Sequence, residues 1–309
     1  MTSQITDLAD AEITAPVPTV PDVPVSWQPA PAGTPRPKPS VPPAVRRIIG
    51  LLLLAAMFLL GFVVYLYGLS GVVEDRTQNT VYKSFAGALD QATAPVGPAT
   101  EGDPVAVLSI PELGLNGVVV VEGTSSQDLA EGPGHVVASA LPGQAGVSVL
   151  YGKAVTYGAP FAHLEQLDVG ATVTVATGQG IARYRVASFG TSTHPAPDTT
   201  SNRLVLESAN SATNPDIAVQ VTADLVSAPQ PNPGARPQVP AAQQVLATDP
   251  DALVPLVLWS QALLLVSVLG TVAARFWSRW PAYLCTTPIV LAVVWQVYAN
   301  LARLLPNVY

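Results

Sequence analysis

The 309-residue sequence predicts an all-β barrel domain outside the membrane together with three transmembrane α-helices. Three observations predict this arrangement. Only 11% of the residues are charged, against about 25% in an average globular domain. Three long segments are almost free of charged residues. Between the first and the second of them, short runs of strand-forming residues alternate with turns.

Composition also excludes several classes of function. The single cysteine rules out a disulfide framework and any multi-cysteine metal site, and three histidines leave little room for a histidine-rich one. The net charge of −7 argues against a nucleic-acid partner, which would require a basic face. We therefore expect no metal, no cofactor and no nucleic acid.

The first apolar segment, residues 48–69, contains no charged residue and at about 1.5 Å per residue is long enough to cross the hydrocarbon core. It is too long and starts too late for a signal peptide, so we interpret it as a retained anchor. Residues 252–274 and 283–305 are the second and third predicted spans. Pro288 lies near the start of the third, where proline is better tolerated, and Arg303 near its end.

Basic residues predict the orientation of these spans. Four precede the first span and two lie in the turn between the second and third: Arg36, Lys38, Arg46, Arg47, and Arg275 and Arg279. Both clusters place the N-terminus in the cytoplasm. Residues 70–251, with 17 acidic and 7 basic residues, are then extracellular. The sequence thus predicts a multi-pass protein of the cell membrane.

The remaining segments are assigned by composition and periodicity. Proline-rich residues 1–45 predict a disordered cytoplasmic tail. Residues 75–91 carry apolar side chains at four-residue spacing and predict an extracellular helix. Residues 104–225 predict the β-barrel, and proline-rich residues 227–250 a linker back to the membrane. Seven strands are expected: Val105–Ile110, Val118–Val121, Val147–Tyr151, Thr172–Ala176, Ile181–Phe189, Arg203–Ser208 and Ile217–Leu225.

Ordered motifs in the outer segment make the sequence more specific. They are Val107-Leu-Ser-Ile-Pro-Glu-Leu-Gly-Leu-Asn, Val120-Val-Glu-Gly-Thr-Ser, Leu129-Ala-Glu-Gly-Pro-Gly-His, Ala140-Leu-Pro-Gly-Gln-Ala-Gly, Tyr157-Gly-Ala-Pro-Phe and Arg203-Leu-Val-Leu. In this order and spacing they resemble the sortase family, the membrane-bound cysteine transpeptidases of Gram-positive bacteria. The resemblance is closest to the actinobacterial class E type.

The resemblance implies a chemistry that this chain does not carry. In the family, a cysteine thiolate attacks an LPxTG-like sorting signal, a histidine protonates the leaving amine and an arginine stabilises the oxyanion. Here Lys153 stands at the histidine position, Ala209 at the cysteine position, and Asp216 is the nearest counterpart of the arginine. The only cysteine, Cys285, lies inside the third predicted span, so residues 70–251 contain no thiol. We predict a degenerate homologue with no catalytic residues.

Four residues are predicted to line the vacated groove: Lys153, Tyr157, Ser208 and Ala209. Ser208 with Lys153 as its base is the alternative catalytic pair. Two arguments count against it. Strand side chains alternate between faces, so Ser208 should point away from the groove that Ala209 faces, and a lysine base needs a pKa far below its usual value.

Other candidate residues have plainer interpretations. Lys153 is expected to be a solvated lysine at the vacant groove, or a group that attracts a carboxylate. His135, His163 and His194 are expected to be surface or turn residues, because none stands at a catalytic position of the family.

Three functional hypotheses remain open. The chain is a non-catalytic peptide-binding or scaffold module, a divergent transpeptidase or hydrolase with a non-cysteine nucleophile, or a structural subunit that assembles through its spans. We favour the first, which overlaps with the third. The expected partners are membrane lipid and either a sorting-signal-like peptide, whose backbone could pair with a sheet edge, or an envelope membrane protein.

Overall fold

The computed structural model describes residues 42–210, 217–234, 238–276 and 279–309. Residues 1–41 of the predicted tail, which include Arg36 and Lys38, lie outside the described residues. Asp216, the nearest counterpart of the arginine in the resemblance, also lies outside them.

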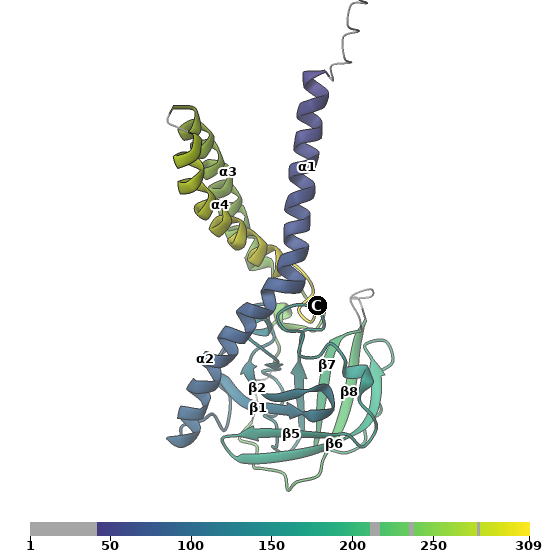
Figure 1. Ribbon diagram of the computed structural model, residues 1–309. Coiled ribbons are helices and arrows are strands. Elements are labelled where there is room, and N and C mark those ends of the chain that lie inside the picture. Colours follow the sequence, from purple (N-terminus) through teal and green to yellow (C-terminus); the bar gives the residue numbers. More distant parts are fainter. Residues whose placement is uncertain (1–41, 211–216, 235–237, 277–278) are drawn as a thin grey trace, which may run out of the picture. The chain divides into compact units, whose positions relative to one another are not determined.

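Eight strands form a closed barrel in the order β1-β2-β3-β4-β7-β8-β6-β5 (Figure 1). The strands are β1 Pro104–Ile110, β2 Leu115–Glu122, β3 Gly134–His135, β4 Val147–Tyr151, β5 Thr172–Thr177, β6 Gly180–Thr191, β7 Arg203–Ala209 and β8 Ala218–Leu225. Neighbours pair antiparallel except β2 with β3 and β4 with β7. The predicted β-barrel is confirmed.

Alternating side chains build the barrel core. In β6, Ala182, Tyr184 and Val186 are buried while the two arginines between them are exposed, as the period of two in a strand requires. Tyr184 adds a polar contact, because its hydroxyl accepts a hydrogen bond from Gly143 N at 2.5 Å. The core is therefore closed by loop backbone as well as by strand side chains.

One strand was not expected from the sequence. β3 contains only Gly134 and His135, and it joins β2 to β4 through short ladders. Two residues are too few to produce an alternating pattern, so the sequence predicted seven strands where the barrel has eight.

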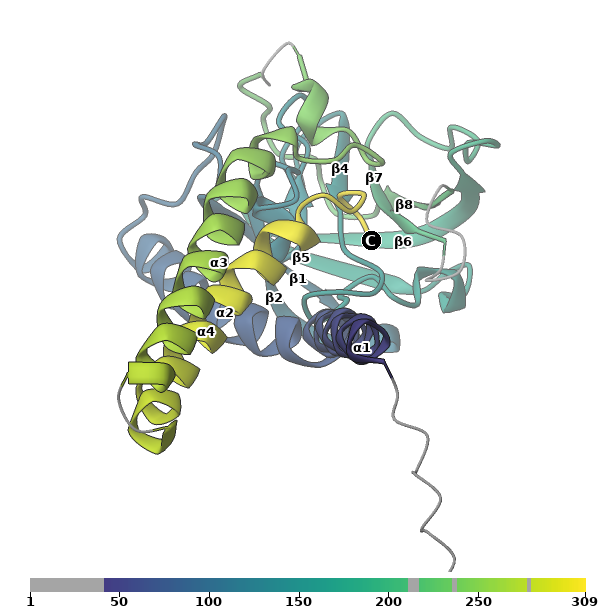
Figure 2. The same cartoon turned by 90° about the horizontal axis from the view of Figure 1, so that it is seen from above.

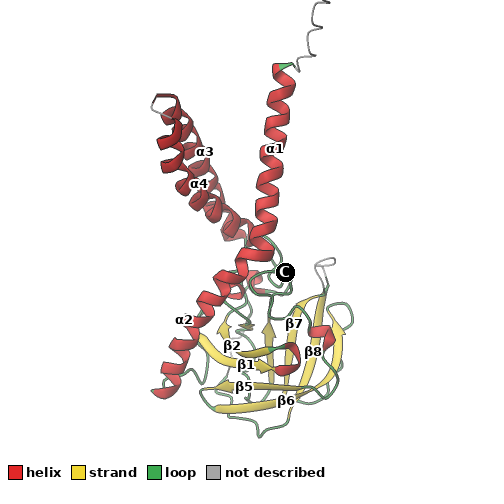
Figure 3. Cartoon of the chain, viewed as in Figure 1, coloured by secondary structure: helices red, strands yellow, loops and turns green. Residues whose placement is uncertain are grey.

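In the part of the chain that the structure describes, three helices are long and apolar enough to cross a membrane: Pro43–Asp90, Pro250–Phe276 and Trp280–Ala302. The first consists of α1 Pro43–Val64, a π-helical turn Tyr65–Leu69 and α2 Ser70–Asp90. The others contain α3 Leu253–Phe276 and α4 Arg279–Ala302, which lie side by side (Figures 1 and 2). Helices and barrel together confirm the predicted fold class (Figure 3).

Aromatic side chains join α4 to the middle of the first helix. Tyr298 lies with its ring centroid 4.9 Å from that of Phe58, and its hydroxyl donates to the Phe58 carbonyl oxygen at 2.7 Å. Tyr65 packs edge-on against Trp295 at 5.0 Å. These contacts direct the chain that leaves α4 toward the barrel.

The described residues between β8 and α3 contact the barrel at two points. Gln230 N donates to Gly143 O at 2.8 Å, and Ala145 N donates to Gln230 O at 2.9 Å. Further on, Thr124 Oγ1 donates to the Gln243 carbonyl oxygen at 2.6 Å. The segment predicted as a linker is thus attached to barrel loops at both of these points.

Candidate functional site

The segments that carry Lys153 and Ala209 meet at one end of the barrel. β4 and β7 pair in parallel with Tyr151 opposite Glu207, so the chain leaves both strands in the same direction. Gly152 N continues the pairing by donating to Glu207 O at 3.0 Å. Sequence positions more than 50 residues apart are thereby brought together.

Lys153 is buried, with only 1% of its surface exposed. Its Nζ donates to the backbone carbonyl oxygen of Asn307 at 3.0 Å and lies 5.4 Å from the ring centroid of Tyr157. Burial lowers the pKa of Lys153 to about 7. The expectation of a solvated lysine is wrong, because residues that follow α4 cover it.

The covering residues form a short stretch, Leu304–Tyr309, called here the 304–309 segment. Its backbone carbonyls accept hydrogen bonds from the loop after β4. Ala154 N donates to Val308 O at 2.9 Å, and Thr156 donates to Tyr309 O through its N at 3.2 Å and its Oγ1 at 3.1 Å. The loop therefore contacts the segment mainly through its backbone.

Val308 fills the space beside Ala209. It is fully buried and packs in one cluster with Leu129, Ala154 and Ala209. We call Leu129, Ala154 and Ala209, together with Lys153 and Thr156, the Lys153–Ala209 site. An apolar side chain of the same protein therefore occupies the position next to Ala209.

The opposite side of the 304–309 segment is held by residues of the preceding linker. Asn307 N donates to Ala247 O and Asn307 Nδ2 donates to Gln244 O, each at 2.9 Å. Arg303 Nε donates to Asp249 Oδ2 at 2.9 Å just before the segment begins. The segment is thus enclosed between the β4 loop and residues 244–249.

Ser208 and Tyr157 are engaged elsewhere. Ser208 is fully buried and its Oγ donates to Gly152 O at 2.8 Å. Among the described residues, no hydrogen bond joins Ser208 to Lys153. Tyr157 N donates to Ser70 Oγ at 2.9 Å, and its hydroxyl lies 3.3 Å from that of Tyr65. The structure brings Lys153, Tyr157 and Ala209 near the segment but directs Ser208 into the barrel wall.

His135 is also not a surface residue. It is 2% exposed, with Nδ1 2.7 Å from Glu122 Oε2 and Nε2 2.9 Å from Ala140 O. The prediction is wrong for this residue because β3 places it inside the ladder between β2 and β4. His163 and His194 are exposed, as predicted.

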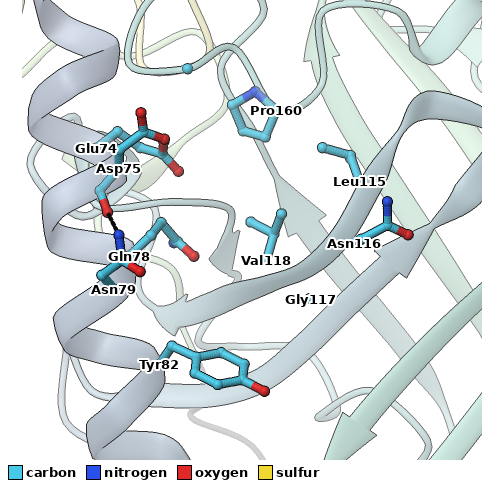
Figure 4. A pocket seen from close by; sticks show the side chains of 11 residues that line it. Glu74, Asp75, Gln78, Asn79, Tyr82, Leu115, Asn116, Gly117, Val118 and Pro160 are labelled. Atoms are coloured by element: carbon cyan, nitrogen blue, oxygen red, sulfur yellow. Dashed lines mark hydrogen bonds between the residues drawn. The ribbon is translucent and has the colours of Figure 1, made fainter.

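A cavity of about 420 Å³ lies between α2 and β2. Figure 4 shows Glu74 and Asp75 on its helical side, with Leu115 and Pro160 across from them. Gln78 at its wall is committed to the barrel, since its Oε1 accepts from Val119 N at 2.8 Å. The cavity is acidic on one side but does not include Lys153 or Ala209.

Within the described part of the chain, no cluster of three or more histidine, cysteine, aspartate or glutamate residues is arranged to hold a metal ion. The only cysteine in the sequence, Cys285, is exposed on α4. The contacts at the Lys153–Ala209 site are hydrogen bonds and apolar packing.

Sequence reasoning missed the contribution of the 304–309 segment. Its first two residues were assigned to the third predicted span, 283–305, and the remaining four to a short tail. The one local signal is Pro306, which follows α4 and prevents the helix from continuing. That signal predicts where the helix stops and not where the chain goes next.

Comparisons with known proteins identify the barrel. Residues 108–219 match the family model of the sortase domain. Sortase E from Streptomyces avermitilis is 29% identical, with 42% of this chain and 91% of that chain covered and a TM-score of 0.37. A Clostridium perfringens sortase D5 transpeptidase is 16% identical, with coverages of 49% and 99% and a TM-score of 0.42. No curated protein matches the chain.

Proposed function

Since residues 108–219 of this chain are a sortase domain, we propose that the protein is a pseudo-sortase, a non-catalytic peptide- or protein-binding or scaffold module anchored in the membrane at the cell envelope. The missing thiol carries the proposal. The sequence contains one cysteine, Cys285, and it lies in α4 outside the domain. Sortase chemistry uses a thiolate as nucleophile, so this domain lacks the reacting group.

The groups at the two family positions support a binding role. Ala209 has no nucleophilic atom, and Val308 packs against it. Lys153 donates its hydrogen bond to the Asn307 carbonyl oxygen, so it acts as a fixed donor to a peptide group. A site that offers hydrogen-bond donors and an apolar contact, and that directs Lys153 Nζ at a peptide carbonyl oxygen, is suited to holding a peptide segment.

The membrane setting follows from the helices and the basic residues near them. Three helices have the length and composition to cross a membrane. Basic residues Arg46 and Arg47 lie at the start of the first helix, and Arg275 lies in the last turn of α3. By the positive-inside rule we place the N-terminus in the cytoplasm and the sortase domain outside the cell. Its partners are then lipid and a sorting-signal-like peptide or an envelope membrane protein, in an actinobacterial, Gram-positive envelope.

A turnover assay tests the absence of catalysis. The full chain in detergent is incubated with an LPxTG-type peptide and an amine acceptor, and a Ser208→Ala variant serves as the matched control. We expect no cleavage by either protein. Cleavage by the unchanged chain that disappears in Ser208→Ala would overturn the proposal and support the divergent enzyme. Labelling of the outer domain by a serine-reactive probe would point the same way.

The binding role is tested by crosslinking in native membranes followed by identification of the crosslinked partner. A variant that lacks residues 252–309 separates the contribution of the spans from that of the barrel. If partner recovery is unchanged in that variant, the sortase domain carries the interaction. If recovery is lost while the barrel remains folded, the interaction depends on the deleted residues, which comprise the hairpin of α3 and α4 and the 304–309 segment.

A further inference from the structure

The loop after β4 presents a row of hydrogen-bond donors to the 304–309 segment. Three successive carbonyl oxygens of the segment, those of Asn307, Val308 and Tyr309, accept from this loop. The donors are Lys153 Nζ, Ala154 N, Val155 N, Thr156 N and Thr156 Oγ1. Because every peptide has carbonyls, this kind of contact recognises the backbone of the segment, which the hydrogen bond from Tyr309 N to Pro306 O holds in a turn, with little regard to sequence.

Selectivity comes from one apolar position. Val308 is fully buried and lies in one apolar cluster with Leu129, Ala154 and Ala209. Alanine at two of these positions leaves the room that the branched side chain fills. A polar or charged residue in place of Val308 would be buried without partners, which is strongly unfavourable.

We infer that the Lys153–Ala209 site is a peptide-binding site whose resident ligand is the chain's own 304–309 segment, which is held in a turn by the hydrogen bond from Tyr309 N to Pro306 O, and that a peptide able to adopt the same turn competes with that segment for it. The inference rests on the proposed function, because it treats the sortase domain as a binding module. The ligand is a peptide turn with one buried β-branched residue, whose carbonyl oxygens at that residue and on either side of it accept hydrogen bonds from the loop after β4.

Intramolecular occupation has a quantitative consequence. A segment tethered next to its site acts at an effective concentration on the order of millimolar. A separate peptide at about 0.1 mM therefore does not displace it from the unchanged chain. Binding of a second peptide becomes measurable only when the resident segment is weakened or removed.

Thiol labelling in the full chain tests this inference. Every variant carries Cys285→Ser, so that the introduced thiol is the only one. Ala209→Cys places a thiol against Val308, and Val169→Cys, at a position 68% exposed, is the accessible control. We expect a maleimide to label position 209 at least tenfold more slowly than position 169. Equal rates would overturn the inference, because the segment would not cover the site.

The second arm asks whether the segment behaves as a ligand. Pro306→Gly, Asn307→Ser, Val308→Gly and Tyr309→Ser are combined with Ala209→Cys. We expect labelling at position 209 to rise at least tenfold and to fall again when a peptide with the sequence of residues 304–309 is added. The same peptide with Val308→Asp should not protect. Absence of protection by the first peptide would show that the segment is a fixed structural element and not a ligand.

Different results would contradict the non-catalytic function and the occupation of the site by the 304–309 segment. Labelling and its protection need no turnover, so an active enzyme would leave these results unchanged while contradicting the non-catalytic function. If the four substitutions prevent folding, the comparison of positions 209 and 169 in the otherwise unchanged chain still decides whether the site is covered.

Discussion

The ammonium nitrogen of Lys153 lies 3.0 Å from the backbone carbonyl oxygen of Asn307, 154 residues later in the chain. Lys153 stands where the resemblance to sortases places the proton-donating histidine. Here its charge is removed from water and directed at a peptide group of the same protein. This contact joins the barrel to the chain that leaves α4, and the stability of both should therefore depend on the protonation of one lysine.

The first prediction concerns that protonation. The pKa of Lys153 is lowered by burial to about 7, whereas in the unfolded chain it takes the usual lysine value near 10.4. Below pH 7 both states hold the proton, and the cost of burying the charge is fully present. Between pH 7 and about 10 the unfolded state binds more protons, so the free energy of unfolding rises with pH, by up to about 1.4 kcal/mol per pH unit.

The variant Lys153→Met should lack this contribution. Unfolding by urea, followed by tryptophan fluorescence in detergent between pH 6 and 10, measures both proteins. We expect the free energy of unfolding of the unchanged chain to increase relative to that of Lys153→Met as the pH rises. Stability curves that stay parallel across this range would contradict a buried Lys153 with a depressed pKa.

A second prediction concerns the glycine before Lys153. A Cβ atom at Gly152 would lie 2.4 Å from Phe161 Cδ2, so Gly152→Ala should destabilise the barrel by about 1–3 kcal/mol through overpacking. Gly87 in α2 is the matched control, because nothing lies within 4 Å of its added Cβ. Gly87→Ala should be neutral or stabilise by up to about 1 kcal/mol. Thermal unfolding of both variants measures the difference, and an equal effect at the two sites would refute the explanation.

The third prediction tests the buried pair between β2 and β3. Glu122→Leu leaves Nδ1 of His135 without the carboxylate that now lies 2.7 Å away. A buried polar atom without a partner costs about 1–3 kcal/mol. The exposed His163 provides the comparison, since His163→Ala should change stability by no more than about 0.5 kcal/mol. Chemical denaturation measures the free energy of unfolding of each variant. A Glu122→Leu variant as stable as the unchanged chain would show that the pair of Glu122 and His135 does not contribute to stability.

The fourth prediction concerns the ion pair that precedes the 304–309 segment. Asp249 has 7% of its side chain exposed and pairs with Arg303. Arg303→Met removes the cation and leaves the carboxylate with the Asp251 amide as its hydrogen-bond donor, which should cost about 1–3 kcal/mol. We expect faster amide exchange in residues 304–309 of this variant. Arg183→Met, at an exposed position on β6, should leave the exchange of these residues unchanged.

The sequence alone predicted the architecture and showed that the barrel domain has no thiol. Alternating strand formers between residues 104 and 225 and three uncharged apolar segments predict the barrel and the helices, because both patterns are local and repeat with the period of the element. The absence of a thiol from residues 70–251 is a matter of counting and needs no coordinates. The strand β3 was not predicted because its two residues are too few to show an alternating pattern of buried and exposed side chains.

The tertiary structure decided what surrounds Lys153 and Ala209. Burial of Lys153, the pair of His135 with Glu122 and the packing of Val308 on Ala209 all join residues that no local pattern relates. Val308 follows α4 and Ala209 ends β7, so their contact depends on how the helical hairpin leads the chain back to the barrel. Such contacts arise from the packing of whole elements, and the periodicity of a sequence does not predict them.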